Sequence, residues 1–381
     1  MFDCIIVGGG PGGSSAAYHL AKAGRSVLLL EKAALPRYKV CTGAVSPSVA
    51  SWFDFDFAPA IDSQITRVRY TWNLGDEVNG ELPTEPIWSV RREVFDQFLI
   101  EQAQKAGTEV RDRTAVTGIQ FQGNSHWQVQ VANSEPLTAR YLIAADGAKG
   151  PMASWLGFRE HTLREAGTLE ISTDTPVEAG AFNFEFGMVK NGCLWSFPKR
   201  QGYSLGVSSF IGGSVKAPEK LLSKYAPAFG VSAQQGSFHT HPLKLWDGNQ
   251  TLHTTQALLV GEAAAIVDPL TAEGIRPAMY SGVEAAKAIN RALDNDQEAS
   301  QSALADYTQT IHENWGADMQ WAQRIAKVYF RVPKIGYRVG IKRPTATKRL
   351  GQILAGEVSY ADIANRVVKR ITTSLIPGIG K

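Results

Sequence analysis

Gly8, Gly10 and Gly13 have the spacing of a phosphate-binding turn. They lie between an apolar, β-branched run at 4–7 and a helix-forming segment at 14–23. Glycine permits a tight turn at the first position, close approach of the backbone to a pyrophosphate at the second, and close packing of helix on strand at the third. The N-terminus of such a helix offers free N–H groups and a partial positive charge to phosphates. This spacing predicts a dinucleotide-binding site.

A carboxylate stands where the second half of such a site needs one. Glu31 closes an apolar run at 27–30, eighteen residues after Gly13. Its oxygens can accept hydrogen bonds from a ribose diol, whereas they would repel a 2′-phosphate. The two apolar runs and the helix between them predict a βαβ unit, which brings the glycines and the carboxylate to one edge of a parallel sheet. A glycine-rich turn without a ligand is the weaker interpretation.

Two later segments have the features of further dinucleotide-site parts. A predicted strand at 139–145 ends in an acidic residue and a glycine, and another at 257–260 enters a helix through a glycine and a glutamate. The turn and the helix start that follow the second strand can offer backbone donors to a ligand. The residues concerned are Asp146, Gly147, Gly261, Glu262, Pro269 and Gly274. A nicotinamide-dependent dehydrogenase would not need these segments.

In their order, these segments resemble the FAD-dependent oxidoreductases of the p-hydroxybenzoate-hydroxylase-like superfamily, and within it the geranylgeranyl reductase family. The resemblance is carried by segments 8–31, 36–43, 90–96, 145–148, 194–199, 261–275 and 356–360. The fifth is similar to the family's Trp-x-Phe-Pro strand, and the last to its Gly-x-x-Ser-Tyr pattern. Two positions depart from the pattern. Glu262 stands where the superfamily usually has Asp, and Thr42 stands where the reductases continue from the cysteine with Gly-Gly.

The resemblance implies that FAD is the cofactor. It places the glycines of the first turn on the pyrophosphate, Glu31 on the adenosine ribose and Val116 at the adenine. It also places Glu262 on the ribityl chain or the pyrophosphate, and Ile275 at the isoalloxazine. The full implied set of cofactor-binding residues is Gly8, Gly10, Gly12, Gly13, Glu31, Lys32, Cys41, Thr42, Gly43, Arg92, Val116, Asp146, Gly147, Gly261, Glu262, Pro269, Gly274 and Ile275.

Cys41 is the candidate catalytic residue. The resemblance puts it near the flavin and beside the substrate, where a thiol can donate a proton, tune the flavin or shape the pocket. The alternative is a small apolar side chain that fills space. No metal is expected, because His239 and His241 share a face of a predicted strand without a further ligand to complete a site.

Aromatic residues alternate on two predicted strands. Phe182, Phe184 and Phe186 place three rings on one face, and Trp195 and Phe197 do the same on the next strand. This face can line a long apolar pocket suited to a prenyl chain. It can equally be the hydrophobic face of a sheet that packs on its own domain.

The resemblance implies an enzyme that reduces C=C bonds of a geranylgeranyl or other prenyl chain by hydride transfer from reduced flavin. NAD(P)H or another reductant would donate the electrons without a Rossmann unit of its own, because the sequence has no second Gly-x-Gly-x-x-Gly. The alternative is a flavin monooxygenase or halogenase acting on an aromatic or apolar substrate. Segment 193–198 lacks the first tryptophan and the isoleucine of the halogenase pattern Trp-x-Trp-x-Ile-Pro. A FAD-binding redox sensor or scaffold is a third interpretation.

The length of 381 residues exceeds what one hydrophobic core usually serves. We expect an α/β protein with a Rossmann-like FAD-binding domain, an inserted antiparallel β-sheet substrate domain and a helical C-terminal region. The FAD-binding domain would be assembled from 1–60, 88–160 and 252–300. The substrate domain would comprise 61–87 and 161–251, and the basic helical region 301–381.

Charge is distributed unevenly along the chain. The net charge of +3 divides into +11 over 324–381 and −8 over the remainder, and the total is too small to suggest a nucleic-acid partner. A basic amphipathic helix, expected from a cap at Ser359 and Asp362 to about position 375, can lie on anionic lipid or dock on the protein. Three scattered cysteines and no bilayer-length apolar run predict a cytoplasmic protein, with peripheral membrane contact if the hydrophobic substrate is a lipid.

Overall fold

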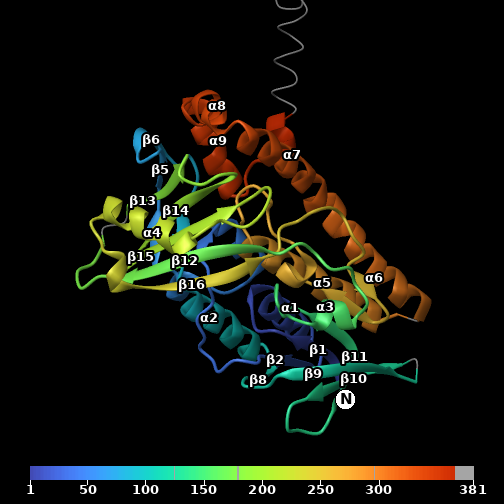
Figure 1. The fold of residues 1–381 in the computed structure, drawn as a ribbon. Helices are drawn as coiled ribbons and strands as arrows, with labels where there is room; N and C mark the ends of the chain where they lie inside the picture. The colour runs from blue at the N-terminus through green and yellow to red at the C-terminus, as the bar shows by residue number, and fades with distance from the viewer. Residues whose placement is uncertain (124, 178–179, 296, 365–381) are drawn as a thin grey trace, which may run out of the picture.

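The computed structural model describes residues 1–123, 125–177, 180–295 and 297–364 (Figure 1). Two large sheets form two lobes, and a set of C-terminal helices runs along both of them. The expected fold class, a Rossmann-like α/β domain with a largely antiparallel second sheet and a helical C-terminal region, is confirmed. Within the described ranges, no helix is both long and apolar enough to cross a membrane.

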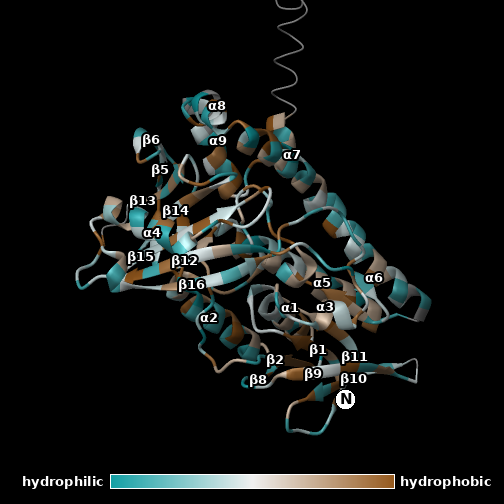
Figure 2. Ribbon diagram, viewed as in Figure 1, coloured by the Kyte–Doolittle hydropathy of each residue, from teal (hydrophilic) through white to brown (hydrophobic). Residues whose placement is uncertain are grey.

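The first sheet has the strand order β17-β18-β11-β1-β2-β8, and a hairpin of β9 and β10 continues from β11. The strands are β1 (Phe2–Val7), β2 (Val27–Leu30), β8 (Glu109–Arg111), β9 (Val116–Gln122), β10 (His126–Val131), β11 (Leu137–Ala144), β17 (His253–Thr254) and β18 (Ala257–Leu259). Neighbours from β18 to β8 run parallel. Apolar side chains fill both faces of β1, where Ile5 and Ile6 are fully buried, and Figure 2 shows this strand in the hydrophobic colour.

The register of this sheet positions the site. Val7 lies opposite Leu30 on one side and Ala144 on the other, so β1, β2 and β11 end at one edge. Helix α1 (Pro11–Lys22) begins at that edge and packs against α5 (Ile275–Leu293). The two helices approach so closely that a Cβ on Gly282 would lie 2.2 Å from the Gly12 carbonyl oxygen.

The second sheet has the order β16-β12-β15-β14-β13-β5-β6 and is antiparallel except for the parallel pair β13–β5. Its strands are β5 (Arg67–Trp72), β6 (Gly75–Glu81), β12 (Arg164–Ser172), β13 (Ala181–Phe186), β14 (Gly192–Lys199), β15 (Gly202–Ser209) and β16 (Gly236–Leu243). A small third sheet joins β3 (Ala44–Val45), β7 (Ile87–Ser89) and β4 (Ser63–Ile65). It contacts α5 through β3 and β14 of the second sheet through β7.

The remaining elements are helical. The α-helices are α2 (Arg92–Lys105), α3 (Met152–Trp155), α4 (Pro218–Tyr225), α6 (Gln297–Ile311), α7 (Ala317–Arg331), α8 (Pro333–Gly336) and α9 (Pro344–Leu354). The 3₁₀-helices are η1 (Pro47–Trp52), η2 (Ala58–Ala60), η3 (Ala226–Phe229), η4 (Ala233–Gln235) and η5 (Gly261–Ala264), and the π-helical turns are η6 (His312–Gly316) and η7 (Tyr337–Ile341).

The C-terminal helices belong to both hydrophobic cores. Tyr307 and Ile311 of α6 are buried with the first sheet, whereas Phe330 of α7 and Tyr337 of η7 are buried with the second. The predicted cap is confirmed, because the Asp362 N–H donates to the Ser359 hydroxyl at 3.0 Å. The predicted continuation of that helix beyond residue 364 lies outside the described residues.

Candidate functional site

A cavity of about 450 Å³ opens at the carboxyl edge of the first sheet, bounded on one side by β16 of the second. Most of the predicted cofactor-binding residues line it: Gly8, Gly10, Gly12, Glu31, Lys32, Cys41, Arg92, Val116, Asp146, Gly147, Gly261, Glu262, Gly274 and Ile275. The four others, Gly13, Thr42, Gly43 and Pro269, lie outside this lining. Segments from both lobes and from more than 250 positions of sequence therefore meet at one cavity.

The glycines of the first turn have different tasks. Gly8 has a φ of +112°, and a Cβ there would lie 2.3 Å from the Ala145 carbonyl oxygen. A Cβ on Gly13 would lie 2.0 Å from the Gly8 carbonyl oxygen, so the protein's own packing requires both glycines. At Gly10 the nearest neighbour of a Cβ would be an Arg37 nitrogen at 3.9 Å. The free space beside Gly10 belongs to the cavity, at the N-terminus of α1, where a phosphate would be stabilised.

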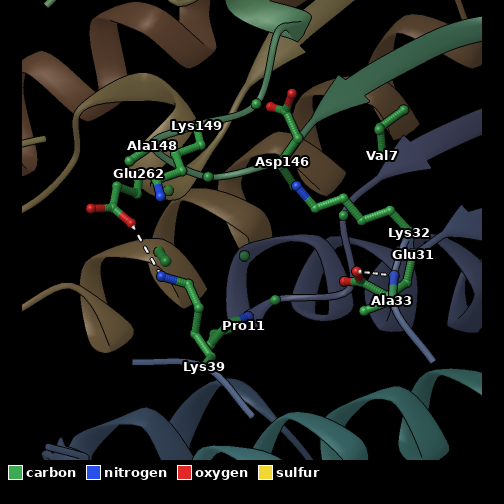
Figure 3. A pocket seen from close by; sticks show the side chains of 18 of the residues that line it. Val7, Pro11, Glu31, Lys32, Ala33, Lys39, Asp146, Ala148, Lys149 and Glu262 are labelled. Carbon is green, nitrogen blue, oxygen red and sulfur yellow. Dashed lines mark hydrogen bonds and ion pairs between the residues drawn. The ribbon is translucent and has the colours of Figure 1, made fainter. Parts of the chain in front are cut away.

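Glu31 is buried and already has protein partners. Its carboxylate accepts a hydrogen bond from the Ala33 N–H at 3.0 Å (Figure 3). It also accepts one from the Gly9 N–H at 3.1 Å and pairs with Arg37 Nε at 3.0 Å. The carboxylate is thereby fixed at the end of β2. Its predicted contact with a ribose stays a prediction.

Buried charges connect Arg37 to the start of α2. Asp96 accepts from Arg37 Nη1 at 2.9 Å and from Arg92 Nε and Nη2, each at 2.7 Å. Burial alone would raise the pKa of Asp96, but the two guanidinium groups hold it below its ordinary value. Arg37 also donates to the Gly9 carbonyl oxygen at 3.1 Å, so this network braces the glycine turn. The Arg92–Asp96 pair has the i,i+4 spacing that a sequence can reveal, whereas nothing local pointed to Arg37.

Asp146 has an unused acceptor in the cavity wall. Its Oδ2 accepts from the Met152 N–H at 2.9 Å, whereas its buried Oδ1 has no hydrogen-bond partner in the described part of the chain. Burial raises its pKa. Lys32 extends toward it from the end of β2 (Figure 3). An unpaired buried oxygen is costly, so this atom calls for a donor from a ligand or from water. Together with the space at Gly10, it fits a bound dinucleotide.

Glu262 contacts two residues outside the predicted cofactor-binding set. Its Oε2 lies 3.0 Å from His241 Nε2 and 3.8 Å from Lys39 Nζ, and Figure 3 shows Lys39 reaching across the cavity to it. Burial would raise the pKa of Glu262, but His241 and Lys39 lower it. The cluster joins the 36–43 segment, β16 and η5. Each pairing spans either about 20 or more than 200 positions, and no local pattern predicts it.

The segment that bears Cys41 is held by β14 of the second sheet. Lys199 Nζ donates to the Thr42 carbonyl oxygen at 2.6 Å and to the Val90 carbonyl oxygen at 2.9 Å, and Trp195 Nε1 donates to the Thr42 hydroxyl at 2.9 Å. Burial lowers the pKa of Lys199 to about 8. Gly43 has a φ of +76° and leaves no room for a Cβ, which would lie 2.1 Å from the Val90 oxygen. Thr42 and Gly43 thus fix the free, partly buried Cys41 against the cavity.

The predicted aromatic face forms a packed cluster beside this site. The ring centroids of Phe182 and Phe197 are 4.2 Å apart, Phe184 stacks on Tyr70, and Phe186 contacts Tyr329 of α7. None of the described residues that line the cavity belongs to this cluster. Trp195 connects the two, because it lies opposite Phe184 in the β13–β14 pair and its Nε1–H donates to the Thr42 hydroxyl.

The glycine assignments predict losses of stability of different size for the same substitution. Gly13→Ala should destabilise the protein by about 2 kcal/mol or more, because the new methyl group meets backbone and cannot be accommodated. Gly10→Ala should cost less than about 1 kcal/mol, because its methyl group enters open space at a helix N-cap. Urea unfolding of ligand-free protein measures both. Equal losses would contradict the assignment.

Lys199→Met tests the buried ammonium. The folded chain holds the pKa of Lys199 at about 8, against 10.5 for an ordinary lysine, so it binds fewer protons than the unfolded chain between these values. The wild type should therefore gain stability relative to the variant as the pH rises through this window, by about 3 kcal/mol in all. The measurement is the difference in unfolding free energy between the two proteins at several pH values. A difference independent of pH would contradict the prediction.

Comparisons with known proteins identify the family. The sequence profile described as FAD dependent oxidoreductase matches residues 3–195. The chain is 30% identical over 299 residues to an uncharacterized protein of Methanosarcina barkeri, covering 77% of this chain and 75% of that one. It is 27% identical to a digeranylgeranylglycerophospholipid reductase of Methanocaldococcus jannaschii, covering 81% of each chain. It is 28% identical to a geranylgeranyl diphosphate reductase of Rhodobacter capsulatus, covering 78% and 77%.

Two solved structures share the fold. One is a geranylgeranyl bacteriochlorophyll reductase-like protein of Thermoplasma acidophilum, with a TM-score of 0.77, 21% identity and coverage of 97% of this chain and 95% of that one. The other is a flavin-dependent brominase, with a TM-score of 0.72, 17% identity and coverage of 98% and 99%. The profile match and the relatives show that the chain belongs to the FAD-dependent oxidoreductase family and is an enzyme whose cofactor is FAD.

Proposed function

We propose that this enzyme reduces C=C bonds in a geranylgeranyl or other prenyl chain. The observation that carries the proposal is the contact of the Cys41 segment with Trp195 and Lys199, because it joins the cofactor cavity to β14, which pairs with the aromatic strand β13. The names of the reductases in Methanocaldococcus jannaschii and Rhodobacter capsulatus support the same substrate class.

In the proposed site, each group of residues has a task toward the cofactor. The N-terminus of α1 beside Gly10 would hold the pyrophosphate, Arg92 would contact the phosphate or ribityl region, and Asp146 Oδ1 would accept a hydrogen bond. When bound, FAD supplies hydride chemistry. The electron donor would be NAD(P)H or another reductant that enters the same cavity, because the sequence has no second glycine motif of this kind.

The protein must position the double bond and exclude water from the site, because an isolated alkene is a poor hydride acceptor. Fixing the double bond against the cofactor replaces an improbable encounter by a defined geometry, and excluding water protects the reaction. Thr42 and Gly43 provide a rigid edge for this purpose. We propose that Cys41 contacts the bond to be reduced, and that Trp195 and Phe197 begin the apolar path for the chain.

The rest of the path would lie at the aromatic cluster of Phe182, Phe184 and Phe186. Of these rings, Phe186 packs against Tyr329 and Tyr337 of the C-terminal helices. A long chain could enter only if these helices and β13 separate along this line. We therefore propose that the C-terminal helices cover the substrate path.

A flavin halogenase or monooxygenase is the second candidate. The brominase shares the fold, which supports this class only at the level of architecture. Cys193 and Phe197 stand where the halogenase pattern has tryptophan and isoleucine, and this difference favours the reductase.

Gly10→Val should abolish retention of FAD without unfolding the protein. The valine side chain would fill the space at the N-terminus of α1 that the pyrophosphate needs. We expect the purified variant to be colourless and the wild-type protein to be yellow. Visible absorbance measures the bound flavin, and far-ultraviolet circular dichroism shows whether the variant is folded. Gly213→Val is a matched control, because a Cβ there meets nothing within 4 Å. Full flavin occupancy in Gly10→Val would contradict the site assignment.

A single-turnover experiment tests the reaction. The bound flavin is reduced without oxygen, and geranylgeranyl diphosphate or a prenylated glycerophospholipid is added. We expect reoxidation together with a product heavier by two mass units per reduced bond, read by mass spectrometry. Reoxidation only by oxygen, with a hydroxylated or halogenated product from an aromatic substrate, would support the second candidate instead. No product under either condition would favour a redox sensor.

A further inference from the structure

The outward surface of the last helices combines exposed apolar and cationic side chains. We define the outer helical face as Lys327, Val328, Arg331, Val332, Lys334, Ile335 and Arg338, at the end of α7 and on α8 and η7. Val328 is 67% exposed, Ile335 60% and Val332 46%, so three large apolar side chains face solvent within eight positions. Isolated apolar residues on a surface are common, but such a group needs a partner or a reason.

The charge around these residues has one sign. Between positions 319 and 356 the sequence has nine Lys and Arg and no Asp or Glu. Within the described ranges, Arg331, Lys334 and Arg338 take part in no ion pair, whereas Lys342 pairs with Asp76 at 2.5 Å. Unpaired cations interspersed with apolar side chains fit a surface that is negatively charged and apolar beneath, as an anionic bilayer is.

The same helices face the proposed substrate path on their inner side. Phe330 stacks on Phe210 with centroids 5.1 Å apart, and Tyr329 and Tyr337 contact Phe186. α7 and α8 lie at one end of the molecule, far from the β9–β10 hairpin (Figure 1). One layer of helix therefore separates the aromatic cluster from the outer helical face.

We propose that the outer helical face binds the surface of an anionic lipid bilayer. Val328, Val332 and Ile335 enter the interface between headgroups and acyl chains, and Arg331, Lys334 and Arg338 contact the anionic headgroups. This extends the proposed function, because a lipid substrate would leave the bilayer beside the helices that cover its path. The binding itself requires no turnover and can be measured separately.

The test is flotation of the full-length, FAD-loaded protein with vesicles of phosphatidylglycerol and phosphatidylcholine or of phosphatidylcholine alone. We expect the wild type to bind the anionic vesicles. The double variant Val328→Asp/Ile335→Asp should partition onto them at least about tenfold less, because it loses apolar area that the bilayer would bury and gains charges that repel the anionic headgroups. Arg331→Gln/Lys334→Gln should weaken binding, and added salt should do the same. Val94→Asp and Leu163→Asp are matched controls, because these residues are 44% and 46% exposed elsewhere on the molecule, and both should bind like the wild type.

Three outcomes would overturn the inference: no binding of the wild type to either vesicle type, equal binding to both, or unchanged binding of the double variants. Flavin absorbance and circular dichroism show that each variant is folded and loaded. Turnover of soluble geranylgeranyl diphosphate separates this inference from the proposed function. If the wild type turns over the substrate but does not bind vesicles, the membrane-binding inference is wrong and the proposed function stands. If it binds vesicles but shows no turnover, the proposed function is wrong and the membrane-binding inference stands.

Discussion

The whole site depends on the close approach of α1 to the edge of the parallel sheet. The helix can begin there only because Gly13 has no side chain, since a Cβ would lie 2.0 Å from the Gly8 carbonyl oxygen. This contact aims the N-terminus of α1 at the point where β1, β2 and β11 end. It also sets where α5 lies, because Gly12 and Gly282 bring the two helices together. The buried Arg37–Asp96–Arg92 network then holds the turn in place from the other side.

A second constraint connects the lobes. Lys199 and Trp195 belong to the second sheet, yet both donate hydrogen bonds to Thr42. Thr42 belongs to the segment that lines the cavity at the edge of the first sheet. Burying a lysine ammonium costs free energy unless it donates hydrogen bonds. Lys199 donates to three oxygens, of Thr42, Ser89 and Val90. The position of Cys41 is thus determined by both lobes. A cofactor on one sheet and an apolar substrate on the other can meet only at such a junction.

The sequence patterns predicted those parts of the site that depend on residues close together in the chain. The tight turn at Gly8 and the carboxylate at Glu31 follow from a βαβ unit of about 30 residues, and that unit is legible without a structure. Lys39, His241 and Lys199 were missed because their partners lie far away in the sequence, and only the packing of the two lobes brings them together. The aromatic residues were identified, but the direction of Phe186 depends on Tyr329 and Tyr337, which follow about 150 positions later. The roles of the individual cofactor residues and the domain limits remain predictions.

The central claim is that cofactor and prenyl chain share the junction at Cys41. A crystal structure of the FAD-loaded enzyme with a geranylgeranyl ligand tests it most directly. We predict density for the pyrophosphate beside Gly10, and density for the prenyl chain that passes Cys41 and Trp195 into the aromatic cluster under α7. A prenyl chain bound away from Cys41, with Phe182, Phe184 and Phe186 packed as they are without it, would contradict the account.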